Sequence, residues 1–156
     1  MQIYFLRHAD PLPKGPKFRE DSLRPLSSEG KKQAKQIARF LHGIQFEAIL
    51  CSPYVRSEQT AQVLSDRLGT KIQASAELSP GFNLMKLPNL VNKHKKAERI
   101  VLIGHEPDFS ETVKKMIGGK VELELSKGGL AVVEIDPERS LNSGKLILLV
   151  QPEFLT

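Results

Sequence analysis

The sequence has one cysteine, no tryptophan and no long apolar run, and each absence excludes a class of protein. A single cysteine excludes a disulfide framework and a cysteine-rich zinc or iron–sulfur site. No apolar run reaches the roughly 18 residues that a membrane span needs. Residues 1–10 lack the basic and cleavable apolar segments of a secretory signal. We therefore expect a cytoplasmic protein that does not associate with a membrane.

Aromatic side chains are scarce, which bears on nucleic-acid binding. Two tyrosines and no tryptophan accompany a formal net charge of +5. This composition offers no set of aromatic side chains on which bases could stack, so we expect a solvated basic surface and no nucleic-acid partner. The densest basic run, residues 93–96, falls at a predicted helix end, where cations favour the helix dipole without any ligand.

Apolar runs alternate with segments of helical periodicity, and no linker, repeat or low-complexity tract divides the chain. We expect one domain over residues 1–156, with an α/β fold in which helices flank both faces of a mostly parallel central sheet. An antiparallel edge is expected among the last strands. The predicted strands are 3–6, 47–51, 71–74, 99–103, 121–125, 130–135 and 145–150; the predicted helices are 28–42, 53–68, 90–97 and 107–117, with loops at 10–25 and 79–88.

Unusual polar residues follow three of the predicted strands. Arg7 and His8 follow the first, Arg56 comes shortly after the second, and His105 follows the strand at 99–103. Ligands of open α/β sheets bind beyond the carboxyl ends of the strands. If these strands are neighbours, two histidines and two arginines meet at one place and form a phosphate site with a nucleophile in it.

This set of residues suits phosphoryl transfer. Guanidinium groups supply the bidentate positive donors that a phosphoryl group needs. The charges of Arg7 and Arg56 oppose protonation of the neighbouring imidazole, which keeps the lone pair of His8 free to attack phosphorus. A second imidazole, that of His105, could stabilise the charge of the transition state.

Three segments resemble the signatures of the histidine phosphatase (phosphoglycerate mutase-like) superfamily, and the similarity is greatest to the SixA-type phosphohistidine phosphatases. The similarity covers essentially the whole chain and implies the phosphoglycerate mutase-like fold. The segments are Leu6-Arg7-His8-Ala9, Ser52 to Ala61 (SPYVRSEQTA) and Gly104-His105; Arg24 to Gly30 (RPLSSEG) and Glu77-Leu78-Ser79-Pro80 resemble further motifs.

The resemblance implies a role for each matching position. His8 would be the nucleophile that becomes phosphorylated, Arg7 and Arg56 would clamp the phosphoryl group, and His105 would complete the site. The third residue of the first signature is usually glycine and is Ala9 here, which adds a methyl group where the backbone approaches the phosphate.

Two further residues have alternative interpretations. Glu77 stands where many relatives have a general acid, and it could equally be a carboxylate at a strand end. Arg24 could be a third phosphate donor from the long loop, or a solvated charge. No metal-binding cluster is visible in the sequence, so we expect no metal and no cofactor.

Cys51 offers a different phosphatase chemistry, which the spacing excludes. Cysteine-dependent phosphatases use a Cys-x₅-Arg loop, whereas only four residues separate Cys51 from Arg56 and none of them is glycine. No P-loop sequence is present either. Cys51 is therefore expected to be a buried strand residue.

The resemblance favours a phosphohistidine phosphatase that acts on a phosphorylated protein, such as a signalling or phosphotransfer domain. The segment between Glu77 and His105 is too short for the inserted cap of mutases and many small-molecule phosphatases, so we expect an open site. Two alternatives remain: a small-molecule phosphomonoesterase or mutase of the same superfamily, and a non-catalytic phosphate-binding adaptor.

Overall fold

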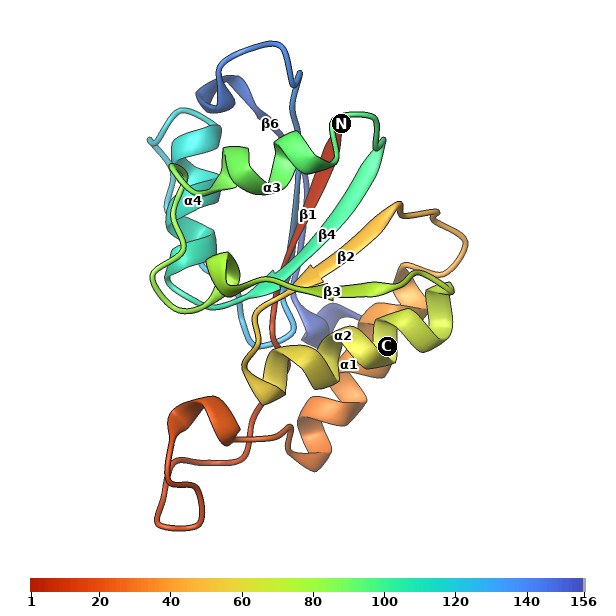
Figure 1. Cartoon of the computed structure of the whole chain (residues 1–156), viewed down its shortest axis with the longest axis vertical. Helices are drawn as coiled ribbons and strands as arrows, with labels where there is room; N and C mark the ends of the chain where they lie inside the picture. The colour runs from red at the N-terminus through yellow and green to blue at the C-terminus, as the bar shows by residue number, and fades with distance from the viewer. Residues whose placement is uncertain (156) are drawn as a thin grey trace.

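A six-stranded sheet forms the centre of the molecule in the computed structural model, which describes residues 1–155 (Figure 1). The strand order is β3-β2-β4-β1-β5-β6. The first four of these strands are parallel, and β5 and β6 are antiparallel, as predicted for the last strands. The strands are β1 Gln2–Arg7, β2 Ala48–Cys51, β3 Ile72–Ala74, β4 Arg99–Gly104, β5 Leu130–Glu134 and β6 Lys145–Val150; the helices are α1 Ser28–Phe40, α2 Val55–Leu68, α3 Leu87–Lys93 and α4 Asp108–Met116.

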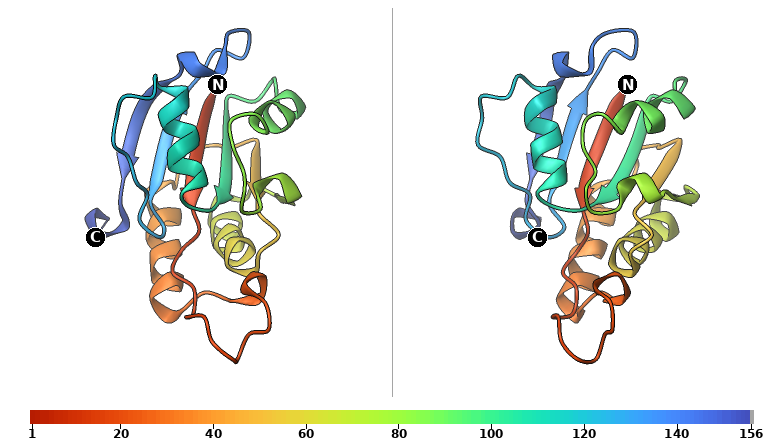
Figure 2. Two further views of the ribbon diagram at one scale, coloured as in Figure 1. Left: turned by 90° about the vertical axis from the view of Figure 1, so that its left-hand side faces the viewer. Right: turned by 60° about the vertical axis from the view of Figure 1, so that its left-hand side comes forward.

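Helices cover both faces of the sheet, which confirms the predicted three-layer arrangement (Figure 2). Alternate residues of β1 divide between the two faces: Phe5 packs with α3 and α4, whereas Leu6 packs with α1 and α2. This alternation follows from the two-residue period of a strand. Both faces of β1 are apolar because both are covered.

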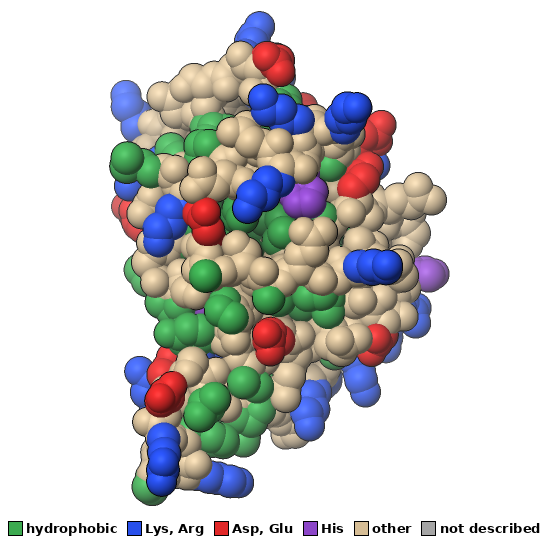
Figure 3. All heavy atoms as spheres, in the orientation of Figure 1, with side chains coloured by type: hydrophobic (Ala, Val, Ile, Leu, Met, Phe, Trp, Pro, Cys, Tyr) green, Lys and Arg blue, Asp and Glu red, His purple; other side chains and the backbone are tan. Residues whose placement is uncertain are grey.

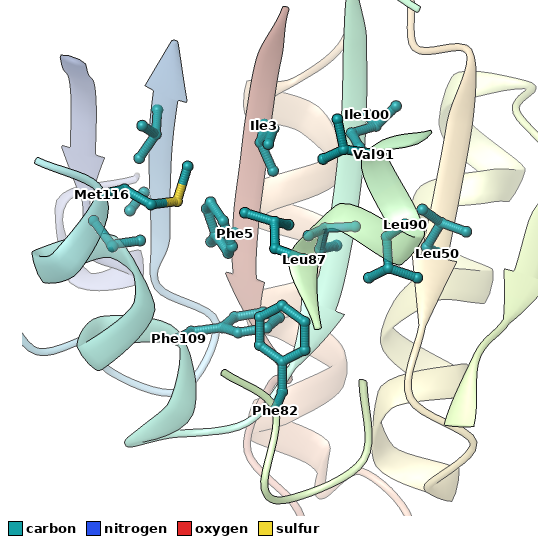
Figure 4. Packing of buried hydrophobic residues seen from close by; sticks show 14 of the residues in the cluster. Ile3, Phe5, Leu50, Phe82, Leu87, Leu90, Val91, Ile100, Phe109 and Met116 are labelled. Atoms are coloured by element: carbon teal, nitrogen blue, oxygen red, sulfur yellow. The ribbon is translucent and has the colours of Figure 1, made fainter. Parts of the chain in front are cut away.

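The core between the sheet and the α3–α4 layer is built around aromatic edge-to-face contacts (Figure 4). The ring centroids of Phe5 and Phe109 are 5.3 Å apart, and those of Phe82 and Phe109 are 5.6 Å apart. Leu87 and Leu90 of α3 are buried in the same cluster. This packing holds α3 on the face of the sheet, away from the carboxyl ends of the strands (Figure 1).

Two of the sequence predictions are wrong. Helix α3 spans residues 87–93 rather than 90–97, because Pro88 lies in its first turn, where the missing N–H costs no hydrogen bond. Residues 121–125 form no strand. At the end of this segment, side chains bind the backbone in place of a neighbouring strand: Gln151 donates to the Glu124 carbonyl at 2.8 Å, and Arg7 donates to the Leu125 carbonyl at 2.8 Å.

The surface carries charges of both signs. On the face shown in Figure 3, Lys and Arg side chains are scattered among Asp and Glu and do not gather into one patch. Within residues 1–155, no helix is long and apolar enough to cross a lipid bilayer.

Candidate active site

Three central strands end side by side and bring the predicted residues together. Arg7 at the end of β1 is paired with Gly104 at the end of β4, and β2 lies on the other side of β4. The His8 N–H donates to the Gly104 carbonyl at 3.0 Å, which fixes the residue after β1 against β4. The ring centroids of His8 and His105 are 5.2 Å apart. The strand ends therefore place two imidazoles next to each other, as expected.

The His8 ring has a defined orientation and is only 6% exposed. Its Nδ1 lies 2.8 Å from the Ala9 carbonyl, a contact that requires a proton on Nδ1. Its Nε2 accepts a hydrogen bond from Nε of Arg56 at 3.1 Å. The pKa of His8 is lowered to about 3, mainly by burial and also by the nearby His105, Arg56 and Arg7, whereas the bond to Ala9 acts to raise it. His8 is thus a neutral imidazole with its lone pair on Nε2.

His105 is a second neutral imidazole, held by residues that follow β2. Its Nε2 lies 2.8 Å from Oγ of Ser52, and that oxygen also accepts the Tyr54 N–H at 3.2 Å. The Tyr54 ring contacts the imidazole edge-on, with centroids 5.0 Å apart. Burial lowers the pKa of His105 to about 4, with a further contribution from Arg56. Ser52 therefore fixes the position of a ring that is uncharged at neutral pH.

Arg56 extends from the first turn of α2 into this cluster and is 4% exposed. Its Nε donates to His8, and its Nη1 and Nη2 donate to the carbonyl oxygen and Oδ2 of Asp21 at 2.7 and 2.9 Å. Its Cζ lies 4.9 Å from the centroid of the Tyr54 ring. A guanidinium has five N–H groups, so one remains on each terminal nitrogen to bind an oxyanion.

Arg7 approaches the cluster from the other side. Its Nη1 donates to the Leu125 carbonyl at 2.8 Å, and its buried Nε has no partner within residues 1–155. Burial lowers the pKa of Arg7, an effect that the carboxylates of Glu106 and Glu124 oppose. Arg7 also lines a surface hollow beside α4, so part of its side chain is accessible from solvent. Arg7 thus has hydrogen-bonding capacity that a phosphoryl oxygen could use.

Ala9 fits the backbone at the position where relatives usually have glycine. No residue other than glycine has a positive φ within the described chain, so Ala9 is not strained there. Its methyl group packs against Leu26 and Ala34. Its N–H donates to Oγ1 of Thr60 at 3.1 Å, and that hydroxyl donates to the Arg56 carbonyl at 2.7 Å. The extra methyl group therefore occupies a small apolar cluster.

The two remaining candidates are held apart from the imidazoles by other partners. Glu77 lies on the short 3₁₀ turn that follows β3, and its oxygens accept from Nδ2 of Asn89 at 3.0 and 3.2 Å. Arg24 binds Oδ1 of Asp21 through Nε at 2.8 Å and Nη2 at 2.7 Å, and its Nη1 donates to the Leu12 carbonyl. Neither side chain has a hydrogen bond to His8 or His105 among the described residues.

The sequence interpretation missed Asp21. This residue lies on a 3₁₀ turn, Asp21–Leu23, within the predicted loop 10–25, and it links Arg24 to Arg56. A carboxylate three residues before a candidate phosphate-binding arginine was the only available signal, and that spacing is common in exposed loops. Ser52 and Thr60 lie within the quoted signatures, but spacing alone gave no role for their hydroxyl groups.

A cysteine nucleophile finds no support in the site. Cys51 is buried, as predicted, and burial raises the pKa of its thiol to about 12, which keeps it protonated. Across residues 1–155, no group of three or more His, Cys, Asp or Glu side chains is arranged to hold a metal ion.

Comparison with known proteins identifies relatives of the whole chain. The family model of the histidine phosphatase superfamily (branch 1) matches residues 3–80, half of the chain. Phosphohistidine phosphatase SixA of Escherichia coli is 27% identical over 144 residues, which cover 87% of this chain and 86% of that protein. An uncharacterized Picosynechococcus protein is 31% identical over 164 aligned positions, and the alignment covers 99% of this chain and 99% of that protein.

Among solved structures, the protein histidine phosphatase SixA complexed with tungstate has the same fold. Its TM-score is 0.87 at 23% identity, with 100% of both chains covered. Fold, family model and relatives agree with one another and with the histidines and arginines found at the strand ends. The chain therefore belongs to the histidine phosphatase superfamily and is a phosphatase.

Proposed function

We propose that this phosphatase hydrolyses phosphohistidine on a protein through a phosphorylated His8. The observation that carries the proposal is the state of His8: a buried neutral imidazole whose Nε2 lone pair points at the Arg56 guanidinium. A phosphoryl group bound by Arg56 is thereby brought next to a nitrogen that can attack it. The sequence relative in Escherichia coli is a phosphohistidine phosphatase, which supports this substrate class.

In the first step, Nε2 of His8 attacks phosphorus and the P–N bond of the substrate breaks. A substrate ring that is protonated on its other nitrogen leaves as neutral imidazole, since the electron pair of the broken bond stays on its nitrogen. His8 becomes a phosphorylated imidazolium that retains its proton on Nδ1. The Ala9 carbonyl, 2.8 Å from Nδ1, accepts a hydrogen bond from that proton and stabilises the charge.

In the second step, water attacks phosphorus and the bond to Nε2 breaks. The products are neutral His8 and dihydrogen phosphate, which then equilibrates with solvent. The Arg56 Nε–H loses its acceptor when Nε2 binds phosphorus, so a phosphoryl oxygen takes that hydrogen bond. In this scheme Arg7 and Arg56 hold the equatorial oxygens, and His105 stabilises their developing charge.

The shape of the chain around the site supports a protein substrate. The segment between Glu77 and His105 holds one 3₁₀ turn, α3 and β4, and α3 packs on a face of the sheet. This part of the chain holds no further helix or strand that could form a cap over the site. A phosphorylated side chain that projects from another protein could enter there, and signalling by phosphotransfer is the process that such a substrate implies.

A comparison of substrates tests this proposal. A histidine-phosphorylated protein and a panel of phosphomonoesters are offered side by side, and kcat/KM is measured for each. We expect the phosphohistidine protein to have the highest kcat/KM, with no turnover of any substrate by His8→Ala. A phosphomonoester that matches or exceeds it would instead support the small-molecule alternative, and no turnover by the wild type would support the adaptor.

A further inference from the structure

We propose that Asp21 is a positioning residue that holds the Arg56 guanidinium in the orientation needed to bind the phosphoryl group, and that Arg24 acts on the site through Asp21. The proposal rests on the proposed phosphoryl-binding role of Arg56. Asp21 contacts the two terminal nitrogens of Arg56, through its carbonyl oxygen at 2.7 Å and its Oδ2 at 2.9 Å. The other carboxylate oxygen, Oδ1, binds Arg24.

The contacts of Arg56 divide between two partners on different parts of the guanidinium. Asp21 takes one N–H from each terminal nitrogen, whereas Nε–H points at Nε2 of His8. The second N–H of each terminal nitrogen remains unused by these contacts. Asp21 therefore fixes the plane of the guanidinium and still leaves donors available for the oxygens of a phosphoryl group on His8.

The turn that carries Asp21 is held in place by its own hydrogen bonds. The Arg24 N–H donates to the Asp21 carbonyl at 3.3 Å, and Nη1 of Arg24 donates to the Leu12 carbonyl at 2.8 Å. Leu12 in turn donates its N–H to the Pro25 carbonyl at 2.8 Å. Arg24 thus ties the 3₁₀ turn to the opposite side of the loop, and its side chain is only 12% exposed.

Burial explains why Arg56 needs a carboxylate. The Arg56 side chain is 5% exposed, and a buried cation without a partner destabilises the folded protein strongly. Asp21 supplies that partner at the solvent side, where its own side chain is 38% exposed. Burial acts to raise the pKa of Asp21, but the bonds from Arg56 and Arg24 lower it overall, so the carboxylate stays charged.

This contact could in principle oppose phosphate, since a carboxylate repels an oxyanion. The backbone carbonyl of Asp21 shares the contact, however, and it cannot leave Arg56 unless the whole turn moves. The bonds through Arg24 and Leu12 resist that movement. The arrangement is therefore a fixed support and differs from a latch that opens for substrate.

Binding of inorganic phosphate tests the proposal without depending on the identity of the substrate. We expect Asp21→Ala to raise the Kd for phosphate about 10- to 100-fold, because a misoriented guanidinium loses its bidentate geometry. Asp21→Glu keeps the charge and should restore part of the affinity. Glu20→Gln, which removes a charge from the same loop without touching Arg56, is the matched control and should bind like the wild type. Circular dichroism checks that each variant is folded.

Arg24 provides a second and milder variant. We expect Arg24→Gln to weaken phosphate binding less than Asp21→Ala, because the Asp21 carboxylate is still present and still binds Arg56 through Oδ2. In the Asp21→Ala background, Arg24→Gln should change the Kd less than it does in the wild type, since the bonds of Arg24 to the Asp21 carboxylate are already lost. An equal loss in both backgrounds would show that Arg24 binds phosphate directly, and this would overturn its assigned role.

Turnover of the best substrate found separates positioning from a purely structural role. The proposal predicts that Asp21→Ala lowers kcat as well as phosphate affinity when both are measured well below its own melting temperature, which should fall below that of Glu20→Gln because the buried Arg56 loses its carboxylate partner. Tighter phosphate binding or faster turnover in Asp21→Ala would identify Asp21 as a latch, and unchanged values would remove it from the site; either result overturns the proposal. A preference for phosphomonoesters would refute the proposed substrate only.

Discussion

His8 and Glu77 both follow strands in the parallel part of the same sheet, but their surroundings differ. His8 follows the central strand β1 and is buried between Arg56 and the backbone of Ala9. Glu77 follows the edge strand β3 and is partly exposed, with both oxygens bound by Asn89. The carboxyl end of a central strand has neighbouring strand ends on both sides, whereas an edge strand has only one. Position after a strand is thus informative only together with the place of that strand in the sheet.

The largest effect expected from this comparison is on the buried nucleophile. His8→Ala should abolish turnover, because no other described side chain places a neutral nitrogen against Arg56. The exposed His42 and the half-buried His94 are the controls, and their alanine variants should stay within a few-fold of the wild type in kcat/KM. Substantial turnover by His8→Ala would contradict the role of His8 as the nucleophile, and the end of the central strand would then have no special place in catalysis.

The next largest effect is expected for the arginine beside His8. Arg56→Lys should lower kcat by roughly 10²–10³, the usual cost of losing one preorganised donor, because an ammonium group cannot bind His8, Asp21 and a phosphoryl oxygen in one plane. Arg39→Lys on the exposed face of α1 is the matched control. Steady-state kinetics gives kcat for both variants, and full activity in Arg56→Lys would contradict the proposal that Arg56 clamps the phosphoryl group.

The sequence predicted the buried cluster well because the information there is local. Apolar strands followed by Arg7-His8 and by Gly104-His105 are readable from the chain, and parallel pairing of neighbouring strands places their carboxyl ends side by side. The loop partner of Arg56 was not predictable in the same way. Asp21 lies 35 positions from Arg56, and the prolines of the loop show that it is irregular without showing where it turns.

The prediction of a strand at residues 121–125 was wrong for a related reason. Its alternating apolar and acidic residues have the pattern of a strand, but the edge of the sheet is occupied by β6, which is far from it in sequence. Side chains of Arg7, Glu106 and Gln151 instead bind the backbone of its last two residues, Glu124 and Leu125. Such side-chain contacts depend on the completed fold, and periodicity does not reveal them.

Glu77 provides a further test of the comparison with His8, because the effect of replacing Glu77 should depend on the substrate. An alkoxide leaving group needs a proton from a positioned acid, worth about 10²–10⁴ in rate, whereas a protonated phosphohistidine carries that proton itself. Glu77→Gln should therefore slow phosphomonoester hydrolysis strongly if Glu77 is the acid, and phosphohistidine hydrolysis only modestly. Glu138→Gln, on an exposed loop, is the control.

Equal and large losses of rate on both substrates would mean that Glu77 acts in a step common to both reactions, such as activation of water. No loss on either substrate would leave Glu77 with its hydrogen bonds to Asn89 as its only role. In both cases the prediction that Glu77→Gln affects the two substrates differently would be wrong.

The smallest expected effect concerns stability. Folded His8 and His105 have pKa values of about 3 and about 4, below the ordinary 6.5, so the unfolded chain binds protons between pH 6.5 and 5 that the folded chain does not. The free energy of unfolding should fall as pH falls through this window, by up to about 1.4 kcal/mol per pH unit for each ring. Urea unfolding of His8→Asn and His105→Asn should show a shallower fall; an unchanged slope would contradict the buried neutral state.

The central claim is that His8 carries the phosphoryl group during turnover, and rapid-quench labelling tests it most directly. The wild type is mixed with a ³²P-labelled phosphohistidine protein, and the reaction is quenched within the first turnover. The position of the label on the enzyme is then mapped by peptide analysis. We predict a label that is labile in acid, stable in base and located on His8, and that is absent from His8→Ala. A label on another residue, or one that persists in His8→Ala, would contradict the account.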